Sequence, residues 1–342
     1  MIETRKTTEA VFIALSAALF SSCGGIQNAI NPAGPQAHNL SRLWWLMFTV
    51  CAVVFVLVMI ALLLSLRNRT LAETTPMLEP PQEQERRRRN VVISAISVTV
   101  IIMFVFLVAS FSAGRSMTAG LANKNGLAIE VTGHQWWWEI RYDDVDASNI
   151  FTTANEIHIP VGVPVTFTLR GADVIHSFWV PNLAGKKDLI PGKINTIWLQ
   201  ADKPGVYRGQ CAEYCGLQHA QMALWVVAEP QEQFNAWRQN QTQTSVSPAS
   251  DSQKRGQQVF LSSTCVMCHA ISGTAAGSNI GPNLTHIGSR NTLAAATMAN
   301  TREHLVQWIK DSQSIKPGNK MPQNNLSDPD LQSLIDYLQS LK

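Results

Sequence analysis

The stretch QCAEYCGLQHAQM, residues 210–222, places two cysteines, a histidine and a methionine in one short segment. It lies between two runs rich in Val, aromatic and Leu residues, GVYRG before it and ALWVVAEP after it. Short runs of this kind, separated by Gly, Pro and Asn, are typical of strands. They recur over residues 125–238, so this region is predicted to be a β-sandwich or barrel whose loops carry the sulfur and imidazole side chains.

The residue types in this loop predict a copper site with two metal ions. A mononuclear blue-copper site needs one Cys, two His and a weak Met. The loop holds Cys211, Cys215, His219 and Met222, and His176 opens the upstream run HSFWVP. The second thiolate allows two coppers to be bridged, each capped by one imidazole, with Met222 and a backbone carbonyl as weak axial ligands. Bridging sulfurs spread an unpaired electron over both ions, which suits rapid one-electron transfer.

Other uses of the cysteine pair stay open on these residues alone. A zinc site would accept two Cys and two His but would leave Met222 unused. A disulfide or a copper-delivering dithiol would use only Cys211 and Cys215. Two further cysteines, Cys265 and Cys268, form a second close pair, and each pair is followed by a His. In a chain of 342 residues this spacing favours metal or haem chemistry over a disulfide scaffold.

Two charge-free apolar runs, residues 43–66 and 91–113, are each long enough to cross a hydrocarbon core of about 30 Å as a helix. Arg67, Arg69 and four arginines at 86–89 lie between them, so the positive-inside rule puts this connection in the cytoplasm. We therefore expect residues 40–113 to form a transmembrane helical hairpin in a bacterial cytoplasmic membrane. Both chain termini then lie on the outer side.

The first 22 residues have the layout of a signal peptide. Arg5 and Lys6 precede an apolar stretch, and small residues come directly before Cys23. These small residues resemble a bacterial lipoprotein cleavage site, which predicts that Cys23 becomes the lipidated N-terminus. An ordinary signal peptide and a retained segment are the alternatives.

The net charge of +3 does not indicate nucleic-acid binding. The basic excess lies beside the apolar runs, because residues 1–124 hold 11 basic and 6 acidic side chains. Residues 125–250 hold 8 basic and 12 acidic side chains, whereas residues 251–342 hold 8 and 6. This difference favours docking between the two regions, though only weakly, since net charge does not define a patch.

The C-terminal part of the chain is predicted to be a separate haem-binding domain. Residues 239–253, QNQTQTSVSPASDSQ, predict a flexible linker. Cys265, Cys268 and His269 then form C-x-x-C-H, in which two thiols add to the haem vinyl groups and the His binds iron. Helical periodicity and the loop KPGNKMP (316–322) complete a pattern over residues 254–342 that resembles a class I cytochrome c. The resemblance implies His269 as the proximal ligand and Met321 as the distal ligand.

Three segments resemble subunit II of haem-copper cytochrome c oxidases: GHQWWWEIRY (133–142), HSFWVPNLAGKKDLIPGK (176–193) and GQCAEYCGLQHAQM (209–222). The resemblance runs from about residue 40 to 238 and implies a cupredoxin-like CuA domain. The implied copper ligands are His176, Cys211, Cys215, His219, Met222 and the backbone carbonyl of Glu213.

The same resemblance implies two further roles. The Glu213 carboxylate would reach a magnesium ion at the boundary with subunit I, and a carboxylate suits that hard cation. Trp136 would be the residue through which electrons arrive. The family often begins its second span with an acidic residue and an aromatic, whereas this chain reads ERRRRNVV (85–92). Glu83 and Glu85 lie near that position, and we assign them no role.

These features predict a multidomain membrane protein: a two-helix hairpin, an all-β CuA domain and an all-α cytochrome c domain. We expect subunit II of a caa3-type cytochrome c oxidase. An external cytochrome c or upstream complex would reduce its haem c, and electrons would pass through CuA to the oxygen-reducing site in subunit I. No bond-making catalysis is expected in this chain. A free-standing membrane electron carrier and a copper-trafficking protein are the alternatives.

Overall fold

The computed structural model describes residues 25–67, 82–119 and 126–342. Residues 38–119 form one compact unit, and the described residues of 1–37 and 120–342 form another. The predicted signal peptide and Cys23 lie outside the described residues.

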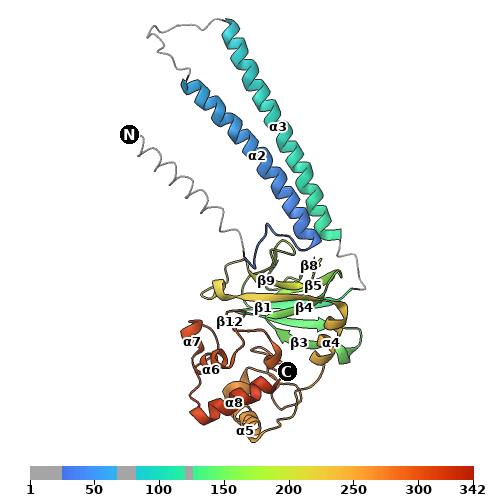
Figure 1. Ribbon diagram of the computed structural model, residues 1–342, viewed down its shortest axis with the longest axis vertical. Coiled ribbons are helices and arrows are strands. Elements are labelled where there is room, and N and C mark those ends of the chain that lie inside the picture. Colours follow the sequence, from blue (N-terminus) through green and yellow to red (C-terminus); the bar gives the residue numbers. More distant parts are fainter. Residues whose placement is uncertain (1–24, 68–81, 120–125) are drawn as a thin grey trace, which may run out of the picture. The chain divides into compact units, whose positions relative to one another are not determined.

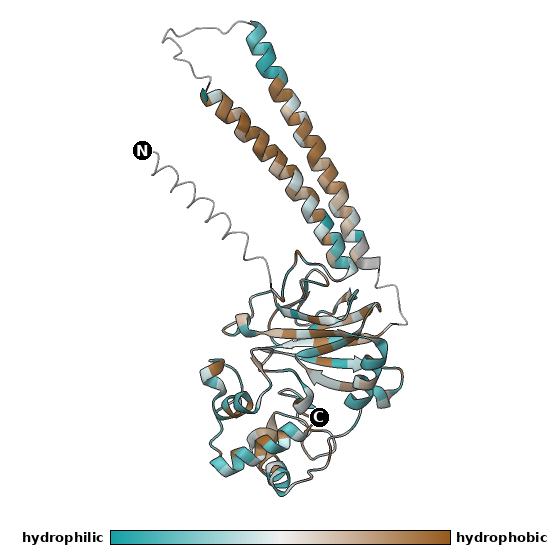
Figure 2. Cartoon of the chain, in the orientation of Figure 1, coloured by the Kyte–Doolittle hydropathy of each residue, from teal (hydrophilic) through white to brown (hydrophobic). Residues whose placement is uncertain are grey.

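Two long helices contain the predicted apolar runs: α2 (Pro35–Arg67) and α3 (Gln82–Ala119). Both are long and apolar enough to cross a membrane. Figure 2 shows their middle parts as strongly hydrophobic, and Phe55 and Phe104 are each 65% exposed. Apolar surface of this extent needs lipid or protein around it. Both helices are longer than the predicted spans, and the four arginines at 86–89 lie on the first turns of α3.

Residues 126–241, which we call the β module, form two five-stranded sheets (Figure 1). The first sheet has the spatial order β3 (Phe151–Ala154), β2 (Trp137–Asp143), β1 (Ala128–His134), β5 (Val165–Gly171), β8 (Asn195–Leu199). The second has the order β4 (Glu156–Pro160), β10 (Ala223–Glu229), β9 (Gly205–Cys211), β6 (His176–Trp179), β7 (Lys187–Leu189). The β1–β5 and β4–β10 pairs are parallel and the others antiparallel.

The core of the β module follows from the alternation of its strands. In β1, Ile129 and Val131 are buried while their neighbours are more exposed, as a period of two residues requires. Trp138, Phe167 and Phe178 are fully buried between the sheets. The helix α4 (Gln231–Gln241) follows the last strand. The all-β domain predicted from the sequence is confirmed.

Residues 251–342, which we call the helical module, contain α5 (Asp251–Ser262), α6 (Arg302–Lys310), α7 (Ser312–Ile315) and α8 (Asp328–Ser340). A short β-hairpin of β11 (Thr292–Leu293) and β12 (Met298–Ala299) precedes α6. The crossing of α5 and α8 depends on Gly256, because a Cβ there would lie 2.0 Å from the Ser333 carbonyl oxygen. The predicted all-α domain is confirmed.

The segment predicted as a linker is shorter than residues 239–253. The helix α4 ends at Gln241 and α5 begins at Asp251, so residues 242–250 connect the two modules. Ser250 caps α5: its hydroxyl accepts from the Gln253 amide and the Gln253 side chain bonds back to its backbone, which forms a capping box. This local pairing explains why the helix begins inside the polar stretch.

Candidate copper and haem sites

Three neighbouring strands bring the predicted copper ligands together. His176 is the first residue of β6, Cys211 is the last residue of β9, and Met222 directly precedes β10. These strands are adjacent in the order β10, β9, β6. The loop between β9 and β10 therefore folds over the end of His176's strand, although 35 residues separate His176 from Cys211.

The side chains form a compact sulfur and nitrogen cluster. The two thiol sulfurs of Cys211 and Cys215 lie 3.7 Å apart. The Nδ1 atom of His176 lies 3.9 Å from the Cys211 sulfur, and that of His219 lies 3.6 Å from the Cys215 sulfur. Met222 Sδ is 3.8 Å from the Cys215 sulfur. Each thiol thus has its own imidazole.

The sulfur separation fits a bridged metal pair and does not fit a disulfide. A disulfide bond is about 2.05 Å long, so the two cysteines are free thiols. Thiolate–metal bonds of about 2.3 Å allow one ion to contact both sulfurs at this separation. The carbonyl oxygen of Glu213 lies 3.2 Å from the Cys211 sulfur and adds an oxygen donor. The donor set is soft, which suits copper.

The charge of the cluster is concentrated on one sulfur. The hydrogen bond from the Cys215 thiol lowers the pKa of Cys211 to about 3 and raises the pKa of Cys215. The His176 ring donates from Nε2 to Asp173 Oδ1 at 2.8 Å, which turns Nδ1 toward the sulfurs. Asp173 therefore orients a copper-site imidazole, a role that the sequence reasoning missed.

Gly133 is a second supporting residue that the sequence reasoning missed. A Cβ at this position would lie 2.9 Å from the His176 ring, so only Gly lets β1 pass this close. The indole of Trp138 also packs edge-on to that ring, with 6.1 Å between centroids. The GHQWWW motif thus supports the site from its first and last residues.

The predicted haem residues line a second site, a cavity of about 870 Å³. Cys265, Cys268, His269 and Met321 all face it. His269 donates from Nδ1 to the Pro282 carbonyl at 2.7 Å, which leaves Nε2 for an iron ion. Burial lowers the pKa of His269, so the imidazole is neutral and suited to bind metal. The fit between this cavity and a large covalently held group is good.

Two other methionines of the helical module, Met267 and Met298, are less suited to be the distal haem ligand. Met298 lies in β12 and packs on the hydrophobic core of the helical module rather than lining the cavity. Met267 lies at the cavity but belongs to the attachment turn η4 (Thr264–Met267) and is 66% exposed. Met321 combines partial burial against the core with a place in the cavity wall, so it fits the distal position best.

Part of the cavity wall belongs to the β module. His134, Gln135, Trp136, Trp137 and Asp173 all line it. Trp136 is 8% exposed, and its Nε1 donates to the Cys215 carbonyl at 3.0 Å. Trp136 therefore lies between the haem cavity and the copper loop, as a buried member of the β module's hydrophobic core.

A buried ionic cluster lies apart from the copper loop. His158 donates to Glu229 Oε1 at 2.9 Å and to Glu156 Oε1 at 3.0 Å, and its ring stacks on Trp237 with 4.0 Å between centroids. Burial alone would lower the pKa of His158, but both carboxylates outweigh it and raise that pKa. Asn291 of the helical module also donates to Glu156. His158 is thus held by residues of the fold and serves a structural role.

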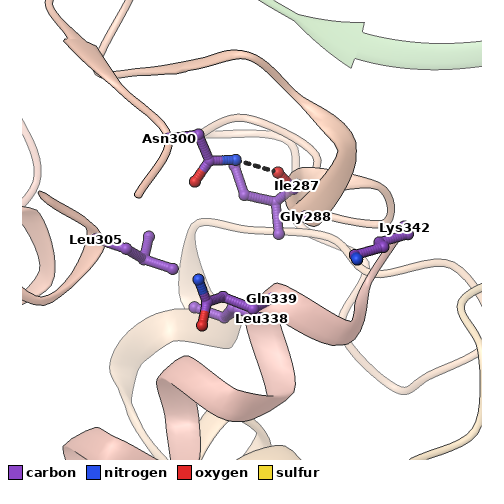
Figure 3. Close-up of a pocket in the computed structure, with 7 residues that line it drawn as sticks. All are labelled: Ile287, Gly288, Asn300, Leu305, Leu338, Gln339 and Lys342. Carbon is purple, nitrogen blue, oxygen red and sulfur yellow. Dashed lines mark hydrogen bonds between the residues drawn. The ribbon is translucent and has the colours of Figure 1, made fainter. Parts of the chain in front are cut away.

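Figure 3 shows a smaller cavity of about 300 Å³ within the helical module. It is bounded by α8, the turn at Gly288 and Asn300, whose side-chain amide donates to the Ile287 carbonyl at 2.7 Å. Its lining carries mainly aliphatic and amide groups, with Lys342 at the margin. These residues provide no catalytic chemistry.

Comparison with known proteins identifies the family. Residues 146–229 match the family described as cytochrome c oxidase subunit II, periplasmic domain, and residues 253–342 match cytochrome c. Cytochrome c oxidase subunit 2 of Alkalihalophilus pseudofirmus strain OF4 is 35% identical over 334 residues, covering 94% of this chain and 93% of the relative. The Bacillus subtilis subunit 2 is 29% identical over 352 residues, covering 97% of each.

A solved structure of the periplasmic domain of subunit II of cytochrome oxidase from Bradyrhizobium japonicum is 33% identical. It covers 34% of this chain and 92% of that chain at a TM-score of 0.32, which is too low to bear on the fold. The conclusion rests on the two curated relatives, whose alignments cover more than nine tenths of this chain and of each relative. The chain belongs to the cytochrome c oxidase subunit 2 family, as a member with a fused cytochrome c domain.

Proposed function

We propose that the loop between β9 and β10 holds a binuclear CuA centre. Its ligands would be the side chains of His176, Cys211, Cys215, His219 and Met222 and the backbone carbonyl of Glu213. The observation that carries this proposal is the pairing of each thiol with its own imidazole at 3.9 and 3.6 Å, around sulfurs 3.7 Å apart. Bound there, copper supplies reversible one-electron transfer.

The helical module would hold one haem c covalently. Cys265 and Cys268 would attach the haem, with His269 and Met321 as axial ligands to the iron. The loop that carries Met321 is well anchored, because Ser312 Oγ and Gln313 Nε2 donate to the Met321 carbonyl at 2.7 and 2.9 Å. A methionine ligand raises the haem potential, which suits a carrier that receives electrons from outside.

This chain is a subunit of a cytochrome c oxidase, and we propose that it serves as the electron relay of that complex. An external cytochrome c or upstream complex would reduce the helical module, and subunit I would receive the electron for oxygen reduction. Trp136 supports the direction of the relay, since it lines the haem cavity and hydrogen-bonds to the Cys215 carbonyl. Tethering the donor to the acceptor keeps its effective concentration high.

Glu213 would connect the copper loop to subunit I. Its carbonyl faces Cys211, whereas its carboxylate is 45% exposed and lies 3.1 Å from Lys186 Nζ. An accessible carboxylate can ligate a magnesium ion once subunit I supplies further oxygen ligands. Oxidase lacking this glutamate would be expected to lose magnesium while retaining copper.

The chain would be anchored in a bacterial cytoplasmic membrane by α2 and α3, with the helical and β modules on the periplasmic side. The arginines at 86–89 and Arg67 lie at the ends of α3 and α2 that the positive-inside rule assigns to the cytoplasm. Cleavage after residue 22 and lipidation of Cys23 would add a second anchor.

The proposal is tested by the metal and haem content of the purified chain. We expect two coppers and one covalent haem per chain, with the electron paramagnetic resonance spectrum of a copper pair that shares one unpaired electron. Co-purification with a large haem-bearing subunit separates an oxidase from a free-standing carrier. A single Cu(I) ion that is released to a chelator would contradict the relay and support copper trafficking.

A further inference from the structure

The β module and the helical module meet along the loop that precedes Met321. Both belong to one compact unit of the chain. The Gln218 side chain donates to the Pro317 carbonyl at 2.7 Å, and Lys320 pairs with Asp173 at 3.4 Å. Gly318 has φ +81°, and a Cβ there would lie 2.8 Å from Leu217. The contacts at residues 317, 318 and 320 thus bring this loop against the copper loop and the strand end beside it.

Lys316 is the first residue of the loop segment 316–320. It is the most buried residue of that segment, with 2% of its surface exposed. Its ammonium group donates to the carbonyls of Trp136 at 3.2 Å, Gln221 at 2.9 Å and Ala294 at 3.1 Å. A protonated lysine has three N–H donors and no acceptor, so the three carbonyls satisfy it completely. Two acceptors belong to the β module and one to the helical module.

These acceptors are next to functional groups on both sides. Gln221 directly precedes the proposed copper ligand Met222, and Trp136 bonds to the carbonyl of Cys215. Ala294 lines the haem cavity. A single buried cation therefore joins the copper loop, the tryptophan beside it and the wall of the haem cavity. Replacing it by an apolar side chain would remove the donor that the buried Trp136 carbonyl has here, which is costly, and would leave the Ala294 and Gln221 carbonyls to share the Thr297 hydroxyl.

The helical module presents a strained turn at this point. Residues 294, 295 and 296 are alanines with φ of +54°, +59° and +58°, which is a backbone conformation that residues other than Gly rarely adopt. Such a turn persists only when its surroundings hold it. The Ala294 carbonyl accepts from Lys316, and the Ala295 carbonyl accepts from the Ala223 amide of the β module at 3.2 Å. The turn is thus fastened from both modules.

We propose that Lys316 is the positioning residue that docks the helical module onto the β module by fastening the turn at residues 294–296. In the docked arrangement Trp136 forms part of the wall of the haem cavity. Only the electron-transfer consequence rests on the proposed function, since the docking contacts themselves are made by protein atoms alone. An external donor would then meet the outer surface of the helical module, because Trp136 is covered.

Hydrogen exchange on the full chain tests the docking directly. The Ala223 amide is protected by the helical module, whereas the Trp225 amide, two residues along β10, donates to Asn155 of the β module at 3.0 Å. In Lys316→Met we expect the Ala223 amide to exchange roughly tenfold faster, as the docked population falls, while Trp225 keeps its protection. Lys310→Met, at an exposed lysine on α6, is the matched control and should leave both amides unchanged.

Lys316→Gln serves where Lys316→Met fails to fold, since its amide still offers two N–H donors. We expect an intermediate rise in Ala223 exchange. Unchanged Ala223 exchange in a folded variant would overturn the proposal. So would an equal rise at Ala223 and Trp225, which would mean that Lys316 stabilises the β module as a whole.

The electron-transfer consequence has its own readout in the cofactor-loaded oxidase. After photoreduction of the haem, Lys316→Met should show a slow phase of reoxidation that depends on solvent viscosity and whose amplitude is roughly tenfold larger than in the wild type, because undocked molecules must redock before they transfer the electron. Absorption spectra of haem and copper should match the wild type. A chain that binds haem but no copper would contradict the proposed copper centre, yet the exchange experiment on that chain would still decide the docking.

Discussion

The two cysteine pairs of this chain differ in their burial and in the number of elements that hold them. Cys211 and Cys215 are buried, with sulfurs 3.7 Å apart, inside a ring of ligands that three strands hold in place. Cys265 and Cys268 are only half-buried on a single 3-10 turn beside a cavity of about 870 Å³. The copper site is therefore preorganised by the β-sandwich, whereas the haem site is a space that its cofactor must fill. The β module should fold without its metal, and the helical module should not fold without its haem.

The largest expected effect is loss of the helical module's fold when haem cannot attach. Without haem, the apolar side chains that line the cavity of about 870 Å³, among them Leu305, Ile309 and Leu338, would face water instead of a packed group. Burying one Leu or Ile side chain stabilises a fold by about 1.5–3 kcal/mol and whole domains are stable by only roughly 5–15 kcal/mol, so exposing several of them would remove most of the module's stability. In Cys265→Ser with Cys268→Ser, calorimetry should show no cooperative transition of the helical module.

The matched variant is Cys211→Ser with Cys215→Ser. It should lose copper while the β module keeps a cooperative transition, since its core surrounds Trp138 and Phe178 rather than a cofactor. Equal loss of folding in both double variants would remove the contrast between the two sites.

Next in size is the effect of a methyl group at the crossing of α5 and α8. In Gly256→Ala the new Cβ would meet the Ser333 carbonyl at 2.0 Å, and backbone atoms cannot move aside as side chains do. Overpacking of this kind should destabilise the helical module by about 3 kcal/mol in denaturant unfolding. Gly277→Ala is the control, because its Cβ would meet nothing within 4 Å. Equal stability of the two variants would show that the helices can separate.

A smaller effect is expected from Asp173, which orients a proposed copper ligand but is not itself a ligand. Asp173→Ala removes the carboxylate that accepts from His176 Nε2 at 2.8 Å and frees the imidazole to rotate. Copper affinity should fall roughly 10- to 100-fold, while the β module stays folded. A competition titration against a copper chelator measures this, with Asp144→Ala as control, since Asp144 pairs with Arg238 instead. Unchanged affinity would mean that the strands alone orient His176.

The smallest effect is the pH dependence of the His158 cluster. Its raised pKa means that stability from His158 is fully present below about pH 6.5 and is lost as pH rises through that raised pKa. Burial opposes ionisation of Glu156, but the hydrogen bond and charge of His158 together with the hydrogen bonds from Asn291 outweigh it and lower the pKa of Glu156. That contribution is lost as pH falls below the ordinary value of 4.5. The cluster is therefore strongest between these two limits.

His158→Gln should accordingly be least stable relative to the wild type near pH 5.5, with a difference that shrinks toward alkaline pH. Denaturant unfolding at several pH values measures it. His304→Gln, at a helix position whose ring bonds to the Ala299 carbonyl, provides the comparison. A difference that grows above pH 8 would contradict the assigned charge of His158.

Much of the fold was predictable because its signals are local. The apolar runs, the alternating strands and C-x-x-C-H each follow from residues close together in the chain. The ends of elements were less predictable: the spans extend to Pro35–Arg67 and Gln82–Ala119, and helices occupy both ends of the predicted linker. Polar flanking turns and the Ser250 capping box extend helices without leaving a hydrophobic pattern.

The candidate ligands were also predictable from residue type and spacing, whereas their supporting residues were not. Gly133 opens the quoted segment GHQWWWEIRY and Asp173 lies in none of the quoted segments, but nothing in the sequence marks either residue as a support for His176. Their roles arise because β1 and the loop after β5 lie beside His176. Trp136 was expected to be the point where electrons arrive. The structure puts it under the helical module, beside the haem cavity, which the sequence could not indicate.

The sequence by itself determined the chemistry of this protein, because soft ligands and haem-attaching thiols are specified by side-chain type. Only the tertiary structure decided how the two redox sites face each other. Lys316 is one of 27 basic residues in the sequence, and nothing near it predicts burial. It acquires its place because three carbonyls, at 180, 95 and 22 residues from it along the chain, converge around its ammonium group. Spatial convergence of this kind depends on packing between modules, which local sequence does not encode.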